Sequence, residues 1–576
     1  MADYAEQVLI TGVKDGQHCV VCKVPPKERH TLVRDNRPNQ SNAEFWPIRT
    51  PTDTQRLIRE QTAANVRPVH PDYVHKVSNF TWRHAHVNVH EALVPDLLHQ
   101  LHKGIVKHSL DWLSLLIGDI HGKSSKNLST TGRHKLDDNY RNVPHYPGLK
   151  IFNHTAYSRI SQWTGNEQKA IMRQAVPVHA PLLEKDAPDA LRYLKAICDF
   201  VILAHYHSHD EDTLSYLLDA LKRIDTYKHE LRKYRPQDAD GNAIWNIPKF
   251  HNVTHYIRAI ERYGALHNFD TGSYVEAAHM WLVKVFFSLT NKKDTMSQIL
   301  PCATSPISLK RLGWPSCRPT TAFGLNLPPS VWTTVKHVAD HCDISDFAAA
   351  VAVFIRESRG PTAGSTAHGD EADRRELDHS WVHDYPIAIS PSIKYWKADG
   401  KTDVDPTGES QAILRCAPNW QRRGEWIRHN AWVQEYDRAS SGSDPLHGER
   451  VGQVQLIFQT HDLAGTCGDG PPRALVGMAM TMLQVSNGAK HNEVHGMLEF
   501  QAWPNPNSRT RPFLSSLKCY SVGQLLRAAH VIPANRTGKF LINNFVDFDE
   551  YNAVYSSTFL EDNKRHMDAY KKRKRR

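Results

Sequence analysis

The stretch Pro95-Asp-Leu-Leu-His-Gln-Leu-His-Lys-Gly-Ile-Val-Lys-His-Ser-Leu-Asp-Trp-Leu113 carries apolar residues at helical intervals. It predicts a helix that starts near Pro95. Further helices are predicted downstream, at 189–206, 212–234, 248–263 and 274–289. The third of these begins with Pro248 and ends before Gly264, and proline and glycine are typical at those two positions. The sequence therefore predicts a mainly helical region between residues 90 and 290.

The residues before this region are predicted to be rich in loops. The chain starts with Glu6-Gln-Val-Leu-Ile-Thr-Gly12, which predicts a short strand followed by a turn. Neither a partner strand nor a helix is predicted before it, so we expect the chain to begin inside a domain.

The composition changes after residue 300. Segments 301–329 and 358–378 are rich in proline, serine, glycine and polar residues, which predicts linkers on both sides of a short helix at 344–356. Apolar residues that alternate or run together predict strands at 452–459, 473–483 and 494–503.

These patterns predict an α+β protein with several regions, as its length of 576 residues also indicates. The predicted order is a part over 1–300 that is rich in loops at first and then mainly helical, a linker with one short helix over 301–380, a small β-rich domain over 381–560 and a basic tail over 561–576.

The composition excludes several classes of protein. Hydrophobic residues make up 40% and charged residues 23% of the chain, which is typical of a folded globular protein rather than a disordered one or a coiled coil. The chain shows neither a signal peptide nor a run of 18 apolar residues. Its nine cysteines have no regular spacing apart from one Cys-x-x-Cys, so we expect an intracellular protein in a reducing compartment.

The positive charge is concentrated at one end of the chain. The net charge is +10, and six of these charges belong to the last six residues, Lys571, Lys572, Arg573, Lys574, Arg575 and Arg576. Such a run is typical of a nuclear-import signal or a tail that binds nucleic-acid phosphates. We therefore expect a nuclear protein with DNA as a partner, and the alternative is a solvated terminus without a role.

Cys19-Val-Val-Cys22 is half of a tetrahedral zinc site. His99 and His102, at i and i+3 of the helix after Pro95, can direct two imidazoles the same way. We predict that they complete a structural zinc site that closes a loop of about 75 residues, longer than a zinc finger. The alternatives are two buried free cysteines with two unrelated helix histidines, or ligation by His18 or His30.

Other motifs exclude familiar enzyme classes. His251-Asn-Val-Thr-His255 has the spacing of a zinc-protease helix, but Asn252 stands where that motif needs its general-base glutamate. Neither a glycine-rich phosphate loop nor a Gly-x-Ser-x-Gly motif occurs. Glu276 lies near the start of a strongly apolar predicted helix, where the helix dipole alone would favour a structural carboxylate.

Six segments together resemble fungal Plavaka transposases, which are relatives of the CACTA group. They are Cys-Val-Val-Cys-Lys-Val-Pro (19–25), Pro-Asp-Leu-Leu-His-Gln-Leu-His-Lys-Gly (95–104), Ser-Gln-Trp-Thr-Gly-Asn-Glu (161–167), Ala-His-Tyr-His-Ser-His (204–209), Ile-Pro-Lys-Phe-His (247–251) and Leu-Thr-Asn-Lys-Lys-Asp (289–294). The resemblance covers about residues 1–300 and extends weakly over the β-rich region, at His495-Gly-Met and Val531-Ile-Pro.

The resemblance implies a ribonuclease H-like core in which three carboxylates hold two Mg²⁺ ions for DNA strand cleavage and joining. It implies Glu276 as the third acid, with His279 one helical turn later. It also assigns Cys19, Cys22 and His99 to a large helical insertion that precedes this acid.

The sequence departs from the family before the cysteine pair. Two aspartates normally precede that pair by a long stretch, whereas only eighteen residues precede Cys19, with Asp3 and Asp15 as the candidates. We therefore expect a truncated core that does not catalyse transposition as this chain. The alternative is a non-catalytic nuclear protein that binds DNA, a full-length transposase or a second copy of itself.

Overall fold

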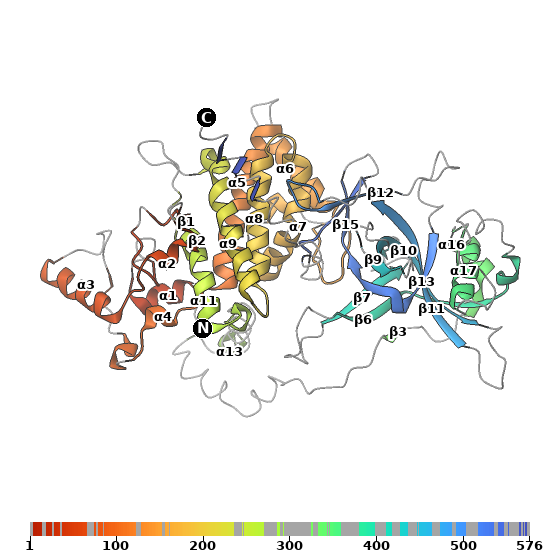
Figure 1. The fold of residues 1–576 in the computed structure, drawn as a ribbon, viewed down its shortest axis with the longest axis horizontal. Coiled ribbons are helices and arrows are strands. Elements are labelled where there is room, and N and C mark those ends of the chain that lie inside the picture. The colour runs from red at the N-terminus through yellow and green to blue at the C-terminus, as the bar shows by residue number, and fades with distance from the viewer. Residues whose placement is uncertain are drawn as a thin grey trace.

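The computed structural model combines helices, mostly in the first half of the chain, with antiparallel strands in the second (Figure 1). This mixture confirms the predicted combination of α and β structure. The structure describes residues 4–13, 19–25, 28–34, 37–65, 74–75, 79–84, 86–121, 128–152, 156–160, 162–235, 245, 247–269, 285–288, 292, 324–325, 332–342, 344, 346–358, 379–397, 410–417, 427–435, 446, 448–462, 473–485, 491–502, 517–534, 539–546, 551, 564–565, 568–569 and 571–572.

The helices before residue 97 are mostly short. They are α1 (Tyr4–Thr11), α2 (Asn42–Phe45), α3 (Pro51–Ala63), η2 (Phe80–Arg83) and α4 (Val89–Ala92), with the two strands β1 (Val33–Arg34) and β2 (Arg37–Ser41) between them.

The longer helices form a bundle over residues 97–263, which we call the helical body. Its elements are η3 (Leu97–Val106), α5 (Lys107–His121), α6 (Leu128–Arg141), η4 (Tyr157–Arg159), α7 (Gly165–Leu183), α8 (Pro188–Ala204), α9 (Glu211–Tyr227), η5 (Lys228–Tyr234), α10 (Pro248–Asn252), η6 (Val253–His255) and α11 (Tyr256–Tyr263). It is followed by η7 (Leu266–Phe269) and α13 (Val285–Ser288).

The predicted helices of this region are confirmed where the structure describes them. Asp96 caps η3, since its carboxylate accepts hydrogen bonds from the backbone N–H groups of Leu98 and His99. Pro248 opens α10, and Gly264 ends α11 with a φ of 80°, which favours glycine. Most of the helix predicted at 274–289 lies outside the described residues.

The predicted N-terminal strand is wrong, because Glu6–Thr11 lie in helix α1. Two interactions favour the helix. The hydroxyl of Thr11 donates to the carbonyl of Gln7 one turn earlier (2.8 Å), and the Gln7 side chain donates to the carbonyl of Val94 (2.9 Å). Gly12 follows with a φ of 70° and bonds back to Val8, which is a typical helix C-terminus.

Helix α8 is the centre of the helical body. Nearly all its residues are buried, including the charged Lys195 and Asp199. A helix that is apolar all round is expected in a core, and these two charges need partners there. Asp199 accepts hydrogen bonds from Lys195 Nζ (2.7 Å) and from Arg223 Nη1 of α9 (2.6 Å). Arg223 Nε donates in turn to Asp219 (2.8 Å).

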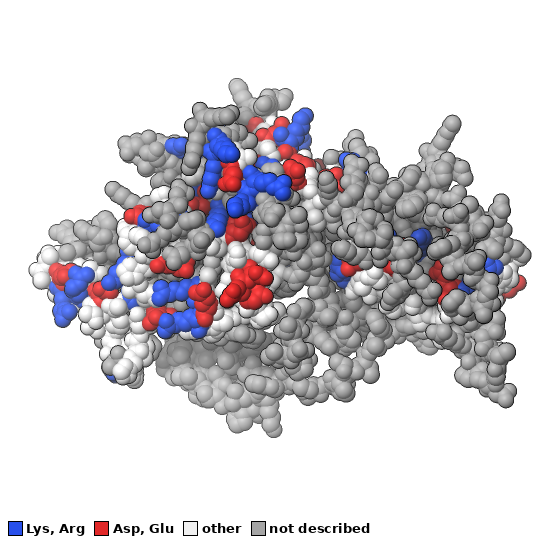
Figure 2. Space-filling view, viewed as in Figure 1, with Lys and Arg blue, Asp and Glu red and all other residues white. Residues whose placement is uncertain are grey.

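Charged side chains also cover the outside of the helical body. Figure 2 shows lysine and arginine side chains gathered over the part of the body where α5, α8 and α9 lie in Figure 1. Among the described residues, none of the helices combines the length and the apolar character needed to cross a membrane.

The strands after residue 320 form two antiparallel sheets, which we call the strand-rich part. Its strands are β3 (Gly324–Leu325), β4 (Trp332–Thr334), β5 (Pro386–Ser390), β6 (Ser392–Lys397), β7 (Ser410–Ala417), β8 (Ile427–Arg428), β9 (Asn430–Gln434), β10 (Glu449–Asp462), β11 (Arg473–Val485), β12 (Leu498–Ala502), β13 (Leu517–Ser521), β14 (Leu525–Ala529), β15 (Val531–Pro533) and β16 (Lys539–Ile542). The helices of this part are α16 (Val335–Cys342), α17 (Phe347–Ser358), η10 (Ser380–Val382) and η12 (Val522–Gln524).

The larger sheet follows the order β14-β9-β10-β11-β12-β16-β15, and β5 and β13 pair with its two central strands β10 and β11. The smaller sheet is β3-β6-β7-β8. Helix α17 packs on the larger sheet, where Phe347 and Phe354 make edge-to-face contacts with Phe458. Gly477 of β11 allows this close approach, since a Cβ there would lie 2.7 Å from the ring of Phe458. The strands predicted at 452–459, 473–483 and 494–503 lie in or overlap β10, β11 and β12.

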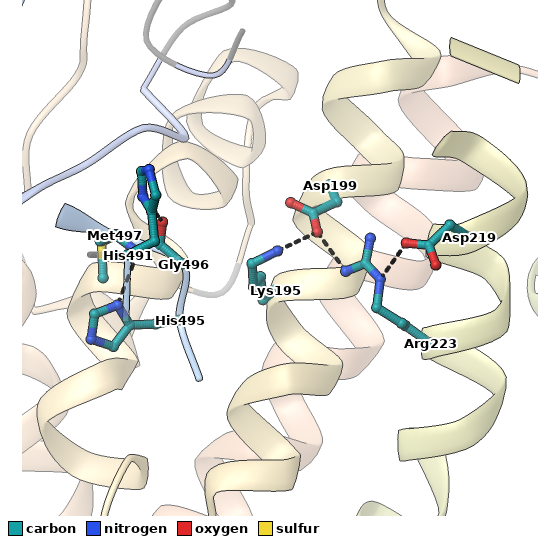
Figure 3. A network of polar contacts seen from close by, with 8 residues as sticks. All are labelled: Lys195, Asp199, Asp219, Arg223, His491, His495, Gly496 and Met497. Atoms are coloured by element: carbon teal, nitrogen blue, oxygen red, sulfur yellow. Dashed lines mark hydrogen bonds and ion pairs between the residues drawn. The ribbon is translucent and has the colours of Figure 1, made fainter. Parts of the chain in front are cut away.

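Polar side chains connect the strand-rich part to the helical body. Asn543 donates to the backbone carbonyl of Arg173 (2.8 Å), and Asn492 donates to the carboxylate of Glu184 (2.7 Å). Figure 3 shows the loop 491–497 on the side of Lys195 that faces away from Arg223. The predicted boundaries between the regions stay predictions.

We expect Asp199→Asn to destabilise the helical body by about 3–5 kcal/mol, because it leaves the buried Lys195 and Arg223 without a shared counter-charge. Thermal unfolding followed by the circular dichroism of the helices measures this change. The control is Asp219→Asn, whose carboxylate is more exposed and binds Arg223 alone. Equal effects of the two substitutions would contradict the central role of Asp199.

Candidate metal centre

Cys19 and Cys22 lie on a turn before β1. The backbone N–H groups of Val21 and Cys22 point at Cys19 Sγ, at 3.3 and 3.4 Å. Cys22 forms an isolated β-bridge with Ile48, and the N–H of Arg49 donates to the carbonyl of Val21 (2.9 Å). The segment before α3 therefore holds the turn in place.

Two histidines of the helical body lie directly beside this turn. His251 belongs to α10 and His255 ends η6, so the two residues are four positions apart. Cys22 Sγ lies 3.2 Å from His251 Nε2, and Cys19 Sγ lies 3.3 Å from His255 Nε2. The two Nε2 atoms are 3.2 Å apart.

The four ligand atoms all lie within 4.8 Å of one another, and all four residues are buried. A tetrahedral zinc ion with ordinary bond lengths places two nitrogen ligands about 3.3 Å apart and a nitrogen and a sulfur ligand about 3.6 Å apart. The observed separations are close to these values. Two thiolates also balance the charge of a divalent ion. The residues thus fit Zn²⁺ in a closed Cys₂His₂ centre.

The pKa values of the two thiols are shifted in opposite directions. Burial opposes a thiolate at Cys19, yet its pKa is well below the usual value because the Cys22 thiol and the charges of His255 and His251 stabilise it. The pKa of Cys22 is raised well above its usual value, first by burial and then by the neighbouring Cys19. A divalent cation stabilises both thiolates together, since only the thiolate form ligates metal.

The residues around the centre fix its geometry. His90 donates from Nδ1 to the carbonyl of Val20 (2.7 Å) and accepts at Nε2 from the hydroxyl of Thr54 (2.9 Å). Burial lowers the pKa of His90 to about 4, so this ring is neutral and holds the turn at Val20. Arg49 Nε donates to the carbonyl of Cys19 (2.8 Å), which places a buried positive charge beside the thiolates.

The histidines predicted as ligands lie elsewhere. The Nδ1–H of His99 donates to the carboxylate of Asp96 (2.6 Å), the residue that caps its own helix. His102 is buried, and its Nε2 lies 3.3 Å from Nε2 of His205 at the end of α8. The prediction of Cys19 and Cys22 as half of a metal site is therefore compatible with the structure, whereas the choice of His99 and His102 is wrong.

In the sequence, His251 and His255 have the spacing of a zinc-protease helix that lacks the general-base glutamate. The same spacing, four residues apart on helical backbone, also suits two ligands of a structural site. Of the other candidates, His30 is exposed and His18 lies outside the described residues.

The remaining predicted site residues are described only in part. Glu276 and His279 lie outside the described residues. Of the basic tail, Lys571 and Lys572 are helical and exposed, and the structure does not describe Arg573, Lys574, Arg575 and Arg576.

A second group, Glu184, His495 and Glu499, brings three ligand atoms together at the contact between α7 and the strand-rich part. Asn492 Nδ2 donates to both carboxylates, at 2.7 and 3.2 Å. His495 Nδ1 accepts from the N–H of Met497 (3.2 Å), so the neutral ring carries its proton on Nε2 and lacks a lone pair there. This group is better explained as a hydrogen-bonded clamp than as a metal site.

Comparison with protein families supports the resemblance seen in the sequence. Residues 1–113 match the family model Plavaka transposase. The match includes Cys19 and Cys22, and it ends before His251 and His255. A search of curated proteins finds no match.

We expect Cys22→Ser and His255→Ala each to lower the zinc content of the purified chain well below about one ion per molecule, because a structural site needs four ligands. Metal analysis and thermal unfolding on the same samples measure both effects, and the unfolding temperature should fall together with the zinc.

The matched control is His99→Ala, which removes a histidine that does not contact the cysteines. It should keep its zinc. Zinc loss in His99→Ala, or an unchanged zinc content in Cys22→Ser, would contradict the assigned ligand set.

Proposed function

We propose that this chain is a transposon-derived DNA-binding protein of the Plavaka type, with a zinc ion that holds the family-matching segment on the helical body. The observation that carries the proposal is the four-residue centre. Cys19 and Cys22 lie inside the matched residues 1–113, and His251 and His255 lie in the helical body.

The ligand chemistry supports a structural role for this centre. Zinc prefers thiolate and imidazole ligands, whereas Mg²⁺ prefers carboxylate and water oxygens. Four protein ligands leave no open position for water or substrate. The centre therefore stabilises the fold, and the chemistry of DNA strands belongs to other residues.

The proposal includes a ribonuclease H-like origin, in which the helical body is the insertion and Glu276 is the last catalytic acid, with His279 one turn later. In such a site Mg²⁺ would activate the attacking hydroxyl and stabilise the leaving oxygen. The contribution expected from this chain is the Glu276 carboxylate as one ligand. The competing function, a DNA-cleaving enzyme, predicts Mg²⁺-dependent strand cleavage that Glu276→Gln abolishes.

The basic tail supports a nuclear location and phosphate binding. A run of six cations from Lys571 to Arg576 provides a strong sequence-independent attraction for DNA. The exposure of Lys571 and Lys572 is compatible with both roles.

We expect the zinc-loaded full chain to bind a mixed-sequence DNA duplex with an affinity that falls steeply between about 50 and 200 mM salt. Deletion of 571–576 should weaken binding and make it less dependent on salt. Fluorescence anisotropy measures both, and incubation with Mg²⁺ tests for cleavage. Absence of DNA binding by the zinc-loaded chain would overturn the proposal, and cleavage lost in Glu276→Gln would favour the enzyme instead.

Removal of zinc with a chelator should lower the unfolding temperature of the helical body. We expect Zn²⁺ to restore it and Mg²⁺ to fail, because the ligands are nitrogen and sulfur. Restoration by Mg²⁺ would argue against the Cys₂His₂ centre.

A further inference from the structure

Lys222 of the helical body interacts electrostatically with two lysines near the end of the chain. Lys222 is on α9, and Lys564 and Lys571 belong to the C-terminal segment, whose described residues are helical. Lys564 and Lys571 are seven residues apart, which places them on the same side of a helix, two turns from each other.

Several observations place this segment against α9. Figure 1 shows the blue C-terminal pieces in front of the helices α5, α8 and α9, and Figure 2 shows lysine and arginine side chains gathered over the same part. The electrostatics agree. Burial lowers the pKa of Lys222, the charge of Asp219 opposes this, and the positive charges of Lys564 and Lys571 lower it further. Lys564 and Lys571 thus lie beside the helical body and add their charge to that of α9.

Among the described residues, the acid that acts on this cluster is shared with another cation. Asp219 is the acid that acts on Lys222, and its carboxylate already accepts a hydrogen bond from Arg223 Nε at 2.8 Å. Within the described part of the chain, Lys222, Lys564 and Lys571 take part in no ion pair. Asp568, between the two tail lysines, is likewise in no ion pair with a described residue.

Like charges held together cost free energy in the folded state, and a bound polyanion removes this cost. We propose that Lys222, Lys564 and Lys571 form one surface that binds the phosphate backbone of DNA. Lysines on two separate helical segments suit consecutive phosphates along a strand. Lys564 and Lys571 are exposed and Lys222 is half-buried. Each lysine acts as a point charge, so it positions the duplex without reading its sequence.

This inference rests on the proposed DNA binding and adds where the phosphates lie. The surface includes Lys222 of α9, a helix outside the residues 1–113 that match the family model. It also gives Lys564 and Lys571 a defined position beside α9.

The test is Lys222→Gln in the zinc-loaded full chain, with binding to a mixed-sequence duplex measured over a series of salt concentrations. We expect weaker binding to every duplex, and a slope of log affinity against log salt that is smaller by about 0.9, the value for one lost phosphate contact. Lys222→Arg should retain the slope. The matched control is Lys185→Gln, an exposed lysine in the connection between α7 and α8, and it should change neither quantity.

Thermal unfolding separates binding from folding. Lys222→Gln removes both the attraction to Asp219 and the repulsion from Lys564 and Lys571, so the unfolding temperature should stay close to that of the unchanged chain. A lower unfolding temperature would identify Lys222 as a structural residue and overturn the inference.

The remaining outcomes distinguish the two proposals. If the unchanged chain binds DNA and Lys222→Gln keeps the full salt slope, the surface is wrong and the proposed function stands. If the unchanged chain does not bind DNA, the proposed function fails. Binding of polyglutamate as tightly as DNA would indicate an acidic protein as the partner and overturn the assignment to phosphates.

Discussion

The contact that holds the cysteine turn on the helical body joins Cys22 to His251 across 229 residues of chain. Closing so long a loop costs conformational entropy, although the cost rises only slowly with its length. The turn at Cys19 and Cys22 sits among short helices and loops that provide little apolar core of their own. A metal ion bound by all four residues stabilises the closed arrangement and none of the open ones, so its binding free energy becomes folding free energy.

The buried charges of the helical body stabilise one another. Helix α8 is buried on every side, and Lys195 and Asp199 would be costly there if either were alone. Arg223 of α9 completes the group and fixes how the two helices pack. Lys195 also meets the loop of His491 and His495, whose pKa values are lowered mainly by burial, so neutral rings face its charge. The same buried lysine thus serves the contact between helices and the contact with the strand-rich part.

The sequence predicted what depends on local patterns. Apolar periodicity and caps such as Gly264 predict the helices α8, α9 and α11. Apolar patterns also predict the strands β10 and β11. The strand predicted at Glu6–Gly12 failed because long-range contacts, such as that of Gln7 with Val94, favour a helix. The prediction of the histidine ligands is wrong for a related reason. Cys-x-x-Cys identifies half of a site by itself, but the choice among the chain's 35 histidines depends on tertiary packing.

Helix α9 connects the metal centre to the lysine surface. Near its C-terminal end, the carboxylate of Asp225 accepts a hydrogen bond from the N–H of Leu32 (3.3 Å), and Lys228 Nζ donates to the carbonyl of His30. Both contacts reach the segment that follows the cysteine turn. Lys222 lies one turn before Asp225 on the same side of helix α9, and both residues are half-buried. Loosening the cysteine turn would therefore disturb the helix that carries Lys222. If the proposed lysine surface binds DNA, loss of the metal would weaken that binding indirectly.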